Sequence, residues 1–457
     1  MNSHILQILN ALENHPSSLN KLAILEAEKA NVLLQKVLIA TLDPYTTYFI
    51  AKIPGYIQNV TGTLDLTDAI DQLDSLSNRN VTGHAGIAHL AYLLGAVHED
   101  DAIVLQRIIK GDLRCGVSTS TINKIWPKLI SVYPCLLAEK NDPAGKNMAN
   151  IKFPCYSDLK ADGMRANVFC RPDINTIIRG RSGKRADLLG HLESAFDNYK
   201  DLNIVIDGEL IVLEEDGSIM PRKKGNGLLN KAIKGTMTED IAKRVRIRVW
   251  DIIPFEEFDG FQDRKYTVPY SERRAQLYDV FKGDQEAEFA RVLADNDKIS
   301  IIPSKIINNF DEAQEHFEEM IAAGEEGTIL KNFNHIWENK RSKGQVKMKA
   351  VKDCDLEVIG WNPGTVGTKL EGKMGSLICV SSDRKVEVNI SGFEDALRQE
   401  IFENFDTEWK GRIVAVKYNE RIQSKQAGRE HVDSLFLPRF QELREDKSTA
   451  DTSTKIL

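Results

Sequence analysis

Lys160-Ala161-Asp162-Gly163-Met164-Arg165 is the most informative stretch of this sequence, with a lysine and an arginine on either side of an Asp-Gly pair. Asp-Gly is typical of turns, and residues 166–169 that follow form a β-rich run. The stretch therefore predicts a turn that leads into a strand. A partly desolvated lysine amine with cations around it can act as a nucleophile. A surface turn between two solvated cations explains the hexapeptide equally well, so its interpretation depends on the rest of the chain.

Six short motifs follow the hexapeptide in order. They are Arg181-Ser182-Gly183, Asp207-Gly208-Glu209, Val249-Trp250-Asp251, Glu326-Gly327-Thr328-Ile329-Leu330-Lys331, Lys347-Met348-Lys349 and Arg444-Glu445-Asp446-Lys447. Within the strand-rich run 204–212, Asp207-Gly208 is expected to be a turn-prone position that orients the carboxylate of Glu209. Phosphoryl transfer requires positioning and charge compensation, so many cations around a few metal-binding carboxylates suit that chemistry. Each motif alone is weakly informative, but the ordered series is strong.

The hydrophobic pattern divides the chain into three parts. Residues 5–137 are rich in Leu, Ala and Ile at helical spacings, and the polar stretch 139–150 has the composition of a linker. Short β-rich runs then alternate with helical pieces, and from residue 356 short strands are separated by glycines. The pattern predicts an all-helical domain at 1–138, an α+β domain at 139–350 and a small closed β-barrel at 351–457.

Composition restricts the function classes. The chain is 42% hydrophobic and 28% charged, and no apolar run approaches the ~18 residues that a membrane span needs. The start, Met1-Asn2-Ser3-His4, lacks the pattern of a signal peptide, so we expect a cytoplasmic protein. The six cysteines form no CxxC pair, which argues against a zinc knuckle or a disulfide framework.

The charge distribution favours a polyanionic partner despite a net charge of −7. Basic residues concentrate in 179–185, 222–234 and 340–352, and acidic residues in 284–297 and 311–326. Segregation of this kind predicts basic surfaces on an otherwise acidic molecule. Taken singly, each segment is as well explained by an ordinary solvated charge run.

The ordered motifs resemble those shared by ATP-dependent DNA ligases, mRNA capping enzymes and RNA ligases. Over nearly the whole chain the sequence is most similar to the DNA ligases of T-even-type bacteriophages. Three further stretches carry this similarity: 112–118 (DLRCGVS), 226–236 with Asn226-Gly227 and Lys234-Gly235-Thr236, and 435–438 (LFLP). The resemblance implies a multidomain fold with an all-α DNA-binding domain, an ATP-grasp-like nucleotidyltransferase domain that becomes adenylylated, and an OB-fold barrel.

The resemblance also implies the reaction and the nucleotide site. A ligase of this family seals 3′-OH/5′-phosphate nicks in duplex DNA through lysyl-AMP and DNA-adenylate, in replication, repair and recombination. Lys160 would carry the AMP, Trp250 would stack on adenine, and Asp158 would accept a hydrogen bond from the adenine amino group, which would favour ATP over GTP. Plain core packing is the alternative for Trp250. The other expected nucleotide contacts are charged residues: Arg165, Arg181, Glu209, Arg341, Lys347, Lys349, Arg444 and Lys447.

Metal and DNA contacts are implied in the same way. Glu209 and Glu326 would bind Mg²⁺, and Arg181 would meet the 5′-phosphate of the nick. The other expected DNA contacts are Arg107, Arg114, Gly116, Ser118, Lys231 and Lys234. In the stretch 116–120, a capped helix could present its amide groups to phosphate without sequence preference, although an ordinary capped helix explains it too. The protein is expected to act as a monomer, in the host cytoplasm if it is viral.

Four other functions are less consistent with the sequence. A capping guanylyltransferase or an RNA ligase would share Lys160 and the carboxylates, but neither normally carries a helical N-terminal domain. An NAD-dependent ligase would be expected to have a zinc-binding cysteine cluster. A non-catalytic nucleic-acid-binding protein would be expected to have lost at least one of the motifs.

Overall fold

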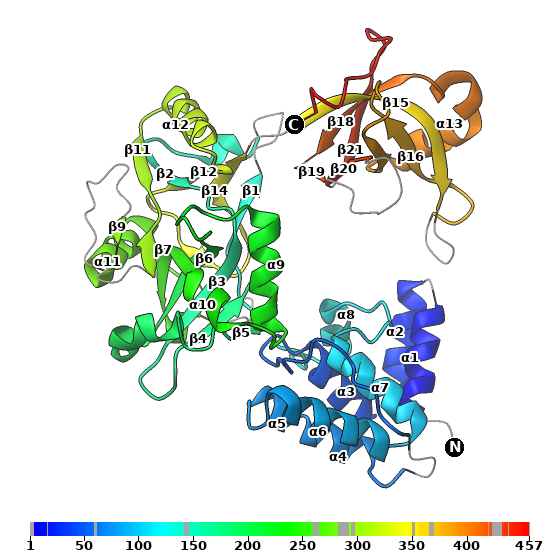
Figure 1. Cartoon of the computed structure of the whole chain (residues 1–457), viewed down its shortest axis with the longest axis vertical. Helices are drawn as coiled ribbons and strands as arrows, with labels where there is room; N and C mark the ends of the chain where they lie inside the picture. The colour runs from blue at the N-terminus through cyan, green and yellow to red at the C-terminus, as the bar shows by residue number, and fades with distance from the viewer. Residues whose placement is uncertain are drawn as a thin grey trace. The chain divides into compact units, whose positions relative to one another are not determined.

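The chain is described by a computed structural model (Figure 1). It describes residues 4–456 except 16, 59–61, 141–145, 259–264, 282–291, 294–297, 350–351, 365–369, 419, 423–431 and 437. The chain divides into two compact units, Met1–Lys349 and Ala350–Leu457, and we describe each by itself. In the described residues no helix combines the length and apolarity needed to cross a membrane.

The N-terminal part of the first unit is helical, which confirms the prediction from the sequence. Its helices are α1 His4–Asn14, α2 Ser18–Ala27, α3 Val32–Leu42, α4 Leu66–Gln72, α5 Asp74–Ser77, α6 Gly83–Ala96, α7 Glu99–Lys110 and α8 Thr119–Ile125. Their apolar faces share one core that includes the fully buried Leu9 and Leu34. In α7 the first turn is acidic, the last turn carries Arg107 and Lys110, and Gly111 ends the helix at φ 68°. These charges complement the helix dipole, and glycine is the residue that best tolerates that φ.

Two larger sheets form the rest of the first unit. The five-stranded sheet has the order β1 Leu137–Lys140, β14 Arg341–Lys349, β12 Gly327–Asn332, β2 Cys155–Leu159 and β11 Ser304–Ile307. The seven-stranded sheet has the order β5 Arg185–Ala186, β4 Ile177–Gly180, β3 Met164–Cys170, β6 Ile204–Val212, β7 Val245–Pro254, β10 Ile299–Ile301 and β9 Val292–Leu293. A small sheet pairs β13 Trp337–Glu338 with β8 Lys265–Tyr266. The mixed α+β architecture agrees with the prediction.

Several helices accompany these sheets. The α-helices are α9 Arg222–Ile233, α10 Glu239–Arg244, α11 Tyr270–Phe281 and α12 Phe310–Ala322, and the 3-10 helices are η1 Met148–Asn150, η2 Glu193–Leu202 and η3 Phe255–Glu257. Leu229 and Ala232 of α9 are buried in the core of the seven-stranded sheet, which fixes this basic helix beside β5 and β6.

The segment before β1 is already part of the sheet architecture. Tyr133 and Leu136 are buried together with Phe169 and Val205 of the seven-stranded sheet, and the Tyr133 hydroxyl donates to the Asn167 Oδ1 at 3.0 Å. The chain has therefore left the helical core before the predicted boundary at 138. A shortened protein that lacks the helical part should keep residues from about 132 onward, because a cut at 138 would open this core.

The hexapeptide connects the two sheets. β2 of the five-stranded sheet ends at Leu159, and β3 of the seven-stranded sheet begins at Met164. Gly163 lies so close to β6 that an added Cβ would be 2.1 Å from the Leu210 carbonyl oxygen. Only glycine fits at this crossing, which explains its place between the lysine and the arginine.

Strand β6 corrects the expected turn at Asp207-Gly208. β6 runs without a break from Ile204 to Val212, and its pairing with β7 shifts between Asp207 and Gly208, so that Trp250 is the extra residue on β7. The two neighbouring strands, β3 and β7, supply backbone partners on both sides, so the turn propensity of Asp-Gly is overridden. The irregularity is a β-bulge, a device that often re-aims a side chain beside a functional site.

The second unit is mainly β-structure. Its elements are β15 Lys352–Pro363, β16 Met374–Val380, β17 Glu387–Ile390, α13 Asp395–Asn404, the π-helix η4 Phe405–Trp409, β18 Ile413–Tyr418, β19 Glu420–Ile422, β20 Ser434–Phe436 and β21 Arg439–Leu443. One sheet has the order β17-β16-β15-β18-β21, and β19 pairs with β20. A C-terminal β-sheet domain is thus confirmed, whereas the described strands do not make a continuous closed ladder.

Candidate functional site

Lys160 lies where the two sheets of the first unit meet. Its backbone N–H donates to the Gly327 carbonyl at 2.9 Å, which continues the pairing of β2 with β12 beyond Leu159. Its ammonium group forms an ion pair with Glu326, the residue just before β12, and its side chain is 17% exposed. The lysine and the acidic residue of two motifs 166 positions apart in the sequence are therefore in direct contact.

Further cations surround this pair. The Arg222 guanidinium lies 3.7 Å from the Glu326 carboxylate and 2.9 Å from that of Asp162, and the Lys349 ammonium lies 3.9 Å from Glu326. Burial lowers the pKa of Lys347, and the neighbouring Lys160 and Arg341 lower it further. The site thus concentrates positive charge, as a pocket for a polyphosphate requires.

Glu209 faces the same centre from β6. Its carboxylate accepts a hydrogen bond from the Gly163 N–H at 3.1 Å. Burial raises the pKa of Glu209 to about 7, although the nearby Lys160 and Arg165 act in the opposite direction. A carboxyl group with this pKa is largely neutral below pH 7. A cation that enters the site favours its ionised form, which is the better metal ligand.

The raised pKa of Glu209 leads to a prediction about stability. Because folding raises this pKa from 4.5 to about 7, the folded protein retains a proton in this range that the unfolded chain releases. Stability should therefore fall as the pH rises through this window, by roughly 3 kcal/mol. Glu209→Gln keeps an acceptor for the Gly163 N–H but cannot ionise. Without nucleotide, its melting temperature should therefore be higher than that of the wild type at pH 8, and the difference should be much smaller at pH 5.

The matched control is Glu215→Gln, which neutralises an exposed carboxylate shortly after the same strand. Its melting difference from the wild type should not grow between pH 5 and pH 8. A difference for Glu209→Gln that is equally independent of pH would contradict the raised pKa.

The two carboxylates suit a hard divalent cation. Glu209 and Glu326 both approach Lys160, and Asp162 is near enough to Glu326 for the two to affect each other's ionisation. Among the described residues there is no cluster of three or more His, Cys, Asp or Glu that would bind a metal alone. Mg²⁺ usually binds one or two carboxylates together with substrate phosphates and water, so this donor set fits that ion.

Asp158 is buried and already has partners within the protein. Its side chain has no exposed surface, and its oxygens accept from the Tyr270 hydroxyl at 2.6 Å and the Ser304 hydroxyl at 2.5 Å. The Lys331 ammonium lies 2.8 Å away. Burial alone would raise the pKa of Asp158, but Lys331 and Arg274 lower it below its usual value. The adenine contact proposed for Asp158 would have to compete with these partners.

Arg165 and Trp250 lie on β3 and β7, the two strands that flank β6. The Arg165 guanidinium donates to both Asp207 oxygens, at 3.0 and 2.5 Å, and to the Leu136 carbonyl at 2.6 Å. Its centre is 5.8 Å from the Trp250 ring. Trp250 is the bulged residue of β7 and is only partly buried, so core packing does not account for its whole surface.

Several residues of this site were not predicted as site residues from the sequence, among them Arg222 and Asp162 beside Glu326. Tyr270 and Ser304 hold the Asp158 carboxylate, and Asp207 holds Arg165 in a two-point ion pair. Asp207 belongs to the same motif as Glu209, but the sequence predicts a site role only for Glu209. Tyr270 and Ser304 stand in no motif, and nothing in their sequence surroundings indicates their role.

The expected DNA contacts are spread over the first unit. Arg107 is only 11% exposed and donates to the Leu113 carbonyl and to Asn10. Arg114 pairs with Glu13 at 2.9 Å, and Ser118 caps α8 by accepting from the Thr121 N–H at 3.2 Å. These contacts account for Arg107 and Ser118 as structural residues, while their proposed contacts with DNA stay predictions.

The remaining predicted residues are more accessible or lie in the second unit. Arg181, in the β4–β5 hairpin, and Lys234, just after α9, are exposed, Lys231 is half-buried on α9, and Arg341 is exposed at the start of β14. In the second unit, Arg444 pairs with Asp355 and Asp446, and Lys447 pairs with Asp355.

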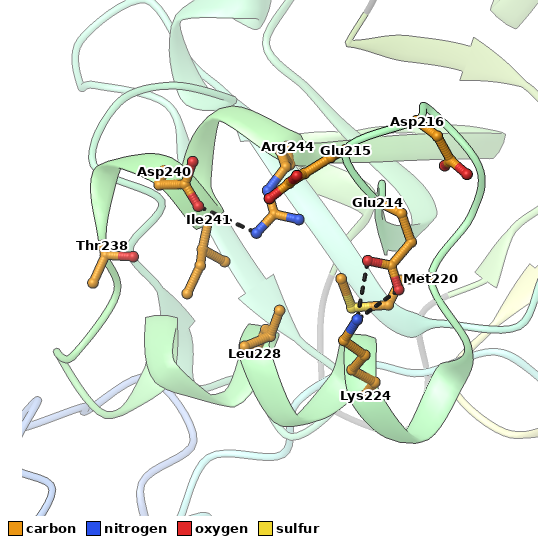
Figure 2. Close-up of a pocket in the computed structure, with 10 residues that line it drawn as sticks. All are labelled: Glu214, Glu215, Asp216, Met220, Lys224, Leu228, Thr238, Asp240, Ile241 and Arg244. Carbon is orange, nitrogen blue, oxygen red and sulfur yellow. Dashed lines mark hydrogen bonds and ion pairs between the residues drawn. The ribbon is translucent and has the colours of Figure 1, made fainter.

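A hollow of about 740 Å³ lies away from this centre (Figure 2). It is lined by Glu214, Glu215, Asp216, Met220, Lys224, Leu228, Thr238, Asp240, Ile241 and Arg244. Lys224 pairs with Glu214 and Arg244 with Asp240, which leaves an acidic surplus. Neither Lys160 nor any other predicted nucleotide contact lines it, and its charge disfavours phosphate.

Comparison with known proteins gives consistent matches. Residues 135–349 match the family described as "ATP dependent DNA ligase domain". The chain is 34% identical to the DNA ligase of Enterobacteria phage T4 and 33% identical to that of Enterobacteria phage T6, in each case over 98% of this chain and 97% of the relative. A solved structure described as "Pmar-Lig_Pre." superposes with a TM-score of 0.63 at 22% identity and covers 96% of this chain and 99% of that one. The last likeness concerns the fold alone.

Proposed function

The chain belongs to the family of ATP-dependent DNA ligases, and from this premise we propose how its residues divide the work of sealing a nick. The proposal is that Lys160 attacks the α-phosphate of ATP, that pyrophosphate leaves, and that the AMP then passes to the 5′-phosphate of the nick. The 3′-hydroxyl next displaces AMP and closes the strand. The ion pair of Lys160 and Glu326 within a ring of cations is the observation that best supports this assignment.

The surroundings of Lys160 favour its reaction with a phosphate. The amine must leave its ion pair with Glu326 and lose its proton before it can attack the α-phosphate. Arg222, Lys347 and Lys349 would compensate the charge of the triphosphate, together with Arg341 at the start of β14, the strand that also carries Lys347 and Lys349. Bound Mg²⁺ would neutralise phosphate charge, and Glu209 and Glu326 would hold it.

The nucleoside would lie against Trp250. Stacking of a base on an aromatic ring contributes ~1–3 kcal/mol, and the bulge of β7 leaves the Trp250 ring partly open for it. Arg165, fixed by Asp207, would contact the ribose or the nick strand, together with Glu209. Asp158 would recognise the adenine amino group only if one of its present partners moved, and Lys331 and Tyr270 would share that recognition.

The other parts of the chain are proposed to bind DNA and to complete the first step. The helical domain, 1–138, would contact the duplex through Arg107, Arg114, Gly116 and Ser118, and Arg107 would also support their loop through its bond to the Leu113 carbonyl. Arg181 would meet the 5′-phosphate, and Lys231 and Lys234 the neighbouring backbone. The adenylylation domain would span 139–350, and the protein would act as a monomer in replication, repair and recombination.

The C-terminal domain, 351–457, is proposed to be an OB-fold barrel. A single bridge between Ser391 and Arg439, with the Phe440 N–H donating to the Ser391 carbonyl at 3.0 Å, links the edge strands β17 and β21 and supports this fold. Arg444 and Lys447 of this domain would contact the leaving pyrophosphate.

Cofactor choice tests the proposal directly. With Mg²⁺ and a nicked duplex, ATP should give sealed product, while GTP and NAD should give none, and omission of the metal should abolish sealing. Labelled ATP and a denaturing gel measure both the protein–AMP species and the sealed strand. Label transfer from GTP would instead favour a capping-type enzyme, and sealing of RNA but not of DNA would favour an RNA ligase.

A further inference from the structure

A second hollow lies where the helical part of the first unit meets its β-sheets. Its volume is about 390 Å³, and it is formed by residues 46–53, the end of α7, the β4–β5 hairpin and the end of α9. Apolar side chains such as Ile50, Ile108 and Ile233 line its floor. Four lysines line it as well: Lys52, Lys110, Lys184 and Lys234. No described residue of the lining carries a carboxylate, so we call it the lysine hollow.

The position of the lysine hollow is fixed by close packing. The Lys184 ammonium donates to the carbonyls of Asp43 at 3.0 Å and Thr46 at 2.7 Å. The Arg185 N–H donates to the Thr47 hydroxyl at 2.9 Å. Gly235, at φ +66°, is so close that an added Cβ would be 2.5 Å from the Phe49 carbonyl oxygen. These contacts hold the segment 43–49 against the sheet domain, and therefore hold the lysines of both parts at one place.

The lysines of the lysine hollow are balanced by no carboxylate in its described lining. Lys184 is engaged by two carbonyls, which satisfy its hydrogen bonds but leave its positive charge. Lys52, Lys110 and Lys234 are exposed. The nearby Asp43 carboxylate accepts from the Thr46 hydroxyl at 2.7 Å and does not line the hollow. Three exposed ammonium groups around apolar side chains suit a nucleic-acid backbone, in which phosphates alternate with sugars: the phosphates would meet the ammonium groups and the sugars the apolar side chains.

Helix α9 sets the distance between the lysine hollow and Lys160. At its first residue, Arg222 lies 2.9 Å from Asp162 and 3.7 Å from Glu326, beside the nucleophile. At its last residue, Ile233 lines the lysine hollow, followed by Lys234. The 12 residues of α9 span about 18 Å at 1.5 Å per residue. At 3.4 Å per base pair, that length corresponds to about five base pairs of duplex.

We propose that the lysine hollow binds backbone phosphates of the DNA substrate about five base pairs from the nick. Lys52, Lys110 and Lys234 make the phosphate contacts, and Lys184 keeps the two parts of the site together. The inference rests on the proposed function, because it places the nick at Lys160. It adds to that function a contact that spans the helical and sheet domains, so that the same duplex is held by both.

The test compares DNA binding by the triple variant Lys52→Ala/Lys110→Ala/Lys234→Ala with that of the wild type. Affinity for a nicked duplex is measured between about 50 and 200 mM salt, where each lost phosphate contact lowers the log–log slope by about 0.9. The slope should fall by up to about 2.7. A second substrate carries neutral methylphosphonate linkages at roughly the fourth to seventh phosphates on each side of the nick. With this substrate the slope of the wild type should fall by the same amount, and the slope of the triple variant should change little further.

A matched control removes three lysines outside the lysine hollow. Lys29, Lys36 and Lys200 pair with Glu26, Asp71 and Asp197, so Lys29→Ala/Lys36→Ala/Lys200→Ala makes the same change in net charge. It should keep the wild-type slope. An unchanged slope in the test variant, an equal fall in the control, or additive effects of variant and methylphosphonate would each overturn the inference.

Adenylylation separates this inference from the proposed function. Both triple variants should form protein–AMP at the wild-type rate without DNA, because none of their lysines is a proposed nucleotide contact, and this also shows that they fold. If the wild type forms no protein–AMP, the proposed function fails; if it does and only the slope is unchanged, the lysine hollow alone is misassigned.

Discussion

Lys160→Ala should form no covalent AMP and should seal no nick, whereas the wild type does both with ATP and Mg²⁺. The reason is chemical: alanine has no nucleophilic atom that could form a bond to phosphorus. The protein–AMP bond should be an acid-labile phosphoramide, and peptide mapping of labelled protein should place it on Lys160. This is the largest effect that we expect from any single substitution.

Lys160→Arg is the matched control for charge and folding. Arginine keeps a positive charge beside Glu326 but cannot be deprotonated in a protein, so it should be as inactive as alanine while it preserves the ion pair. Its melting temperature should therefore stay closer to that of the wild type than that of Lys160→Ala. Label on another residue, or AMP transfer by either variant, would refute Lys160 as the nucleophile.

The sequence was informative where function depends on short linear motifs. Lys160, Glu326 and Lys349 come from three motifs that are far apart along the chain, and the structure brings them together. Both the lysine and the glycine of the hexapeptide must meet a strict local requirement. Lys160 must reach a phosphate, and residue 163 must have no Cβ, because a Cβ there would lie 2.1 Å from the Leu210 carbonyl oxygen. Because both requirements fall on residues of one short stretch, they produce a motif that can be recognised in the sequence.

The sequence was misleading where strands at a distance determine the local structure. Asp207-Gly208 has the composition of a turn, yet β3 and β7 pair with it on both sides and make it a continuous strand. The resulting bulge sets Trp250, and nothing in the residues around Trp250 predicts it. Intrinsic turn propensity is too weak to oppose two full ladders of backbone hydrogen bonds.

Contacts between distant residues were out of reach of the sequence for the same reason. Tyr270 and Ser304, the partners of Asp158, lie 112 and 146 positions from it. The attachment of segment 43–49 to the β4–β5 hairpin likewise depends on Lys184 finding two backbone carbonyls. A lysine and a carbonyl have no sequence signature as a pair, so these contacts appear only in three dimensions.

The two cations of the last motif, Arg444 and Lys447, form ion pairs with carboxylates of their own unit. The Arg444 guanidinium donates to both Asp355 oxygens at 3.1 Å and to Asp446 at 2.8 and 2.7 Å, and Lys447 also pairs with Asp355. This arrangement orients the Arg444 side chain but leaves it 24% exposed. If these cations serve the leaving pyrophosphate, they have a partner only in the first step of the reaction. The second unit would then have to approach the nucleotide for that step and withdraw to admit DNA.

Arg444→Ala should therefore slow formation of protein–AMP by about 10²–10³-fold, the usual cost of removing one donor that stabilises developing charge. It should still seal a nick that already carries AMP on its 5′-phosphate at nearly the wild-type rate, because no pyrophosphate leaves in that step. Asp446→Asn is the control: it keeps the Arg444 charge and the Asp355 contacts, so adenylylation should fall much less. Rates of both steps are measured under single-turnover conditions with labelled ATP and with pre-adenylylated DNA. An equal defect of Arg444→Ala on pre-adenylylated DNA would show that this residue also acts in the later chemistry, and the assignment of the second unit to the first step would then be wrong.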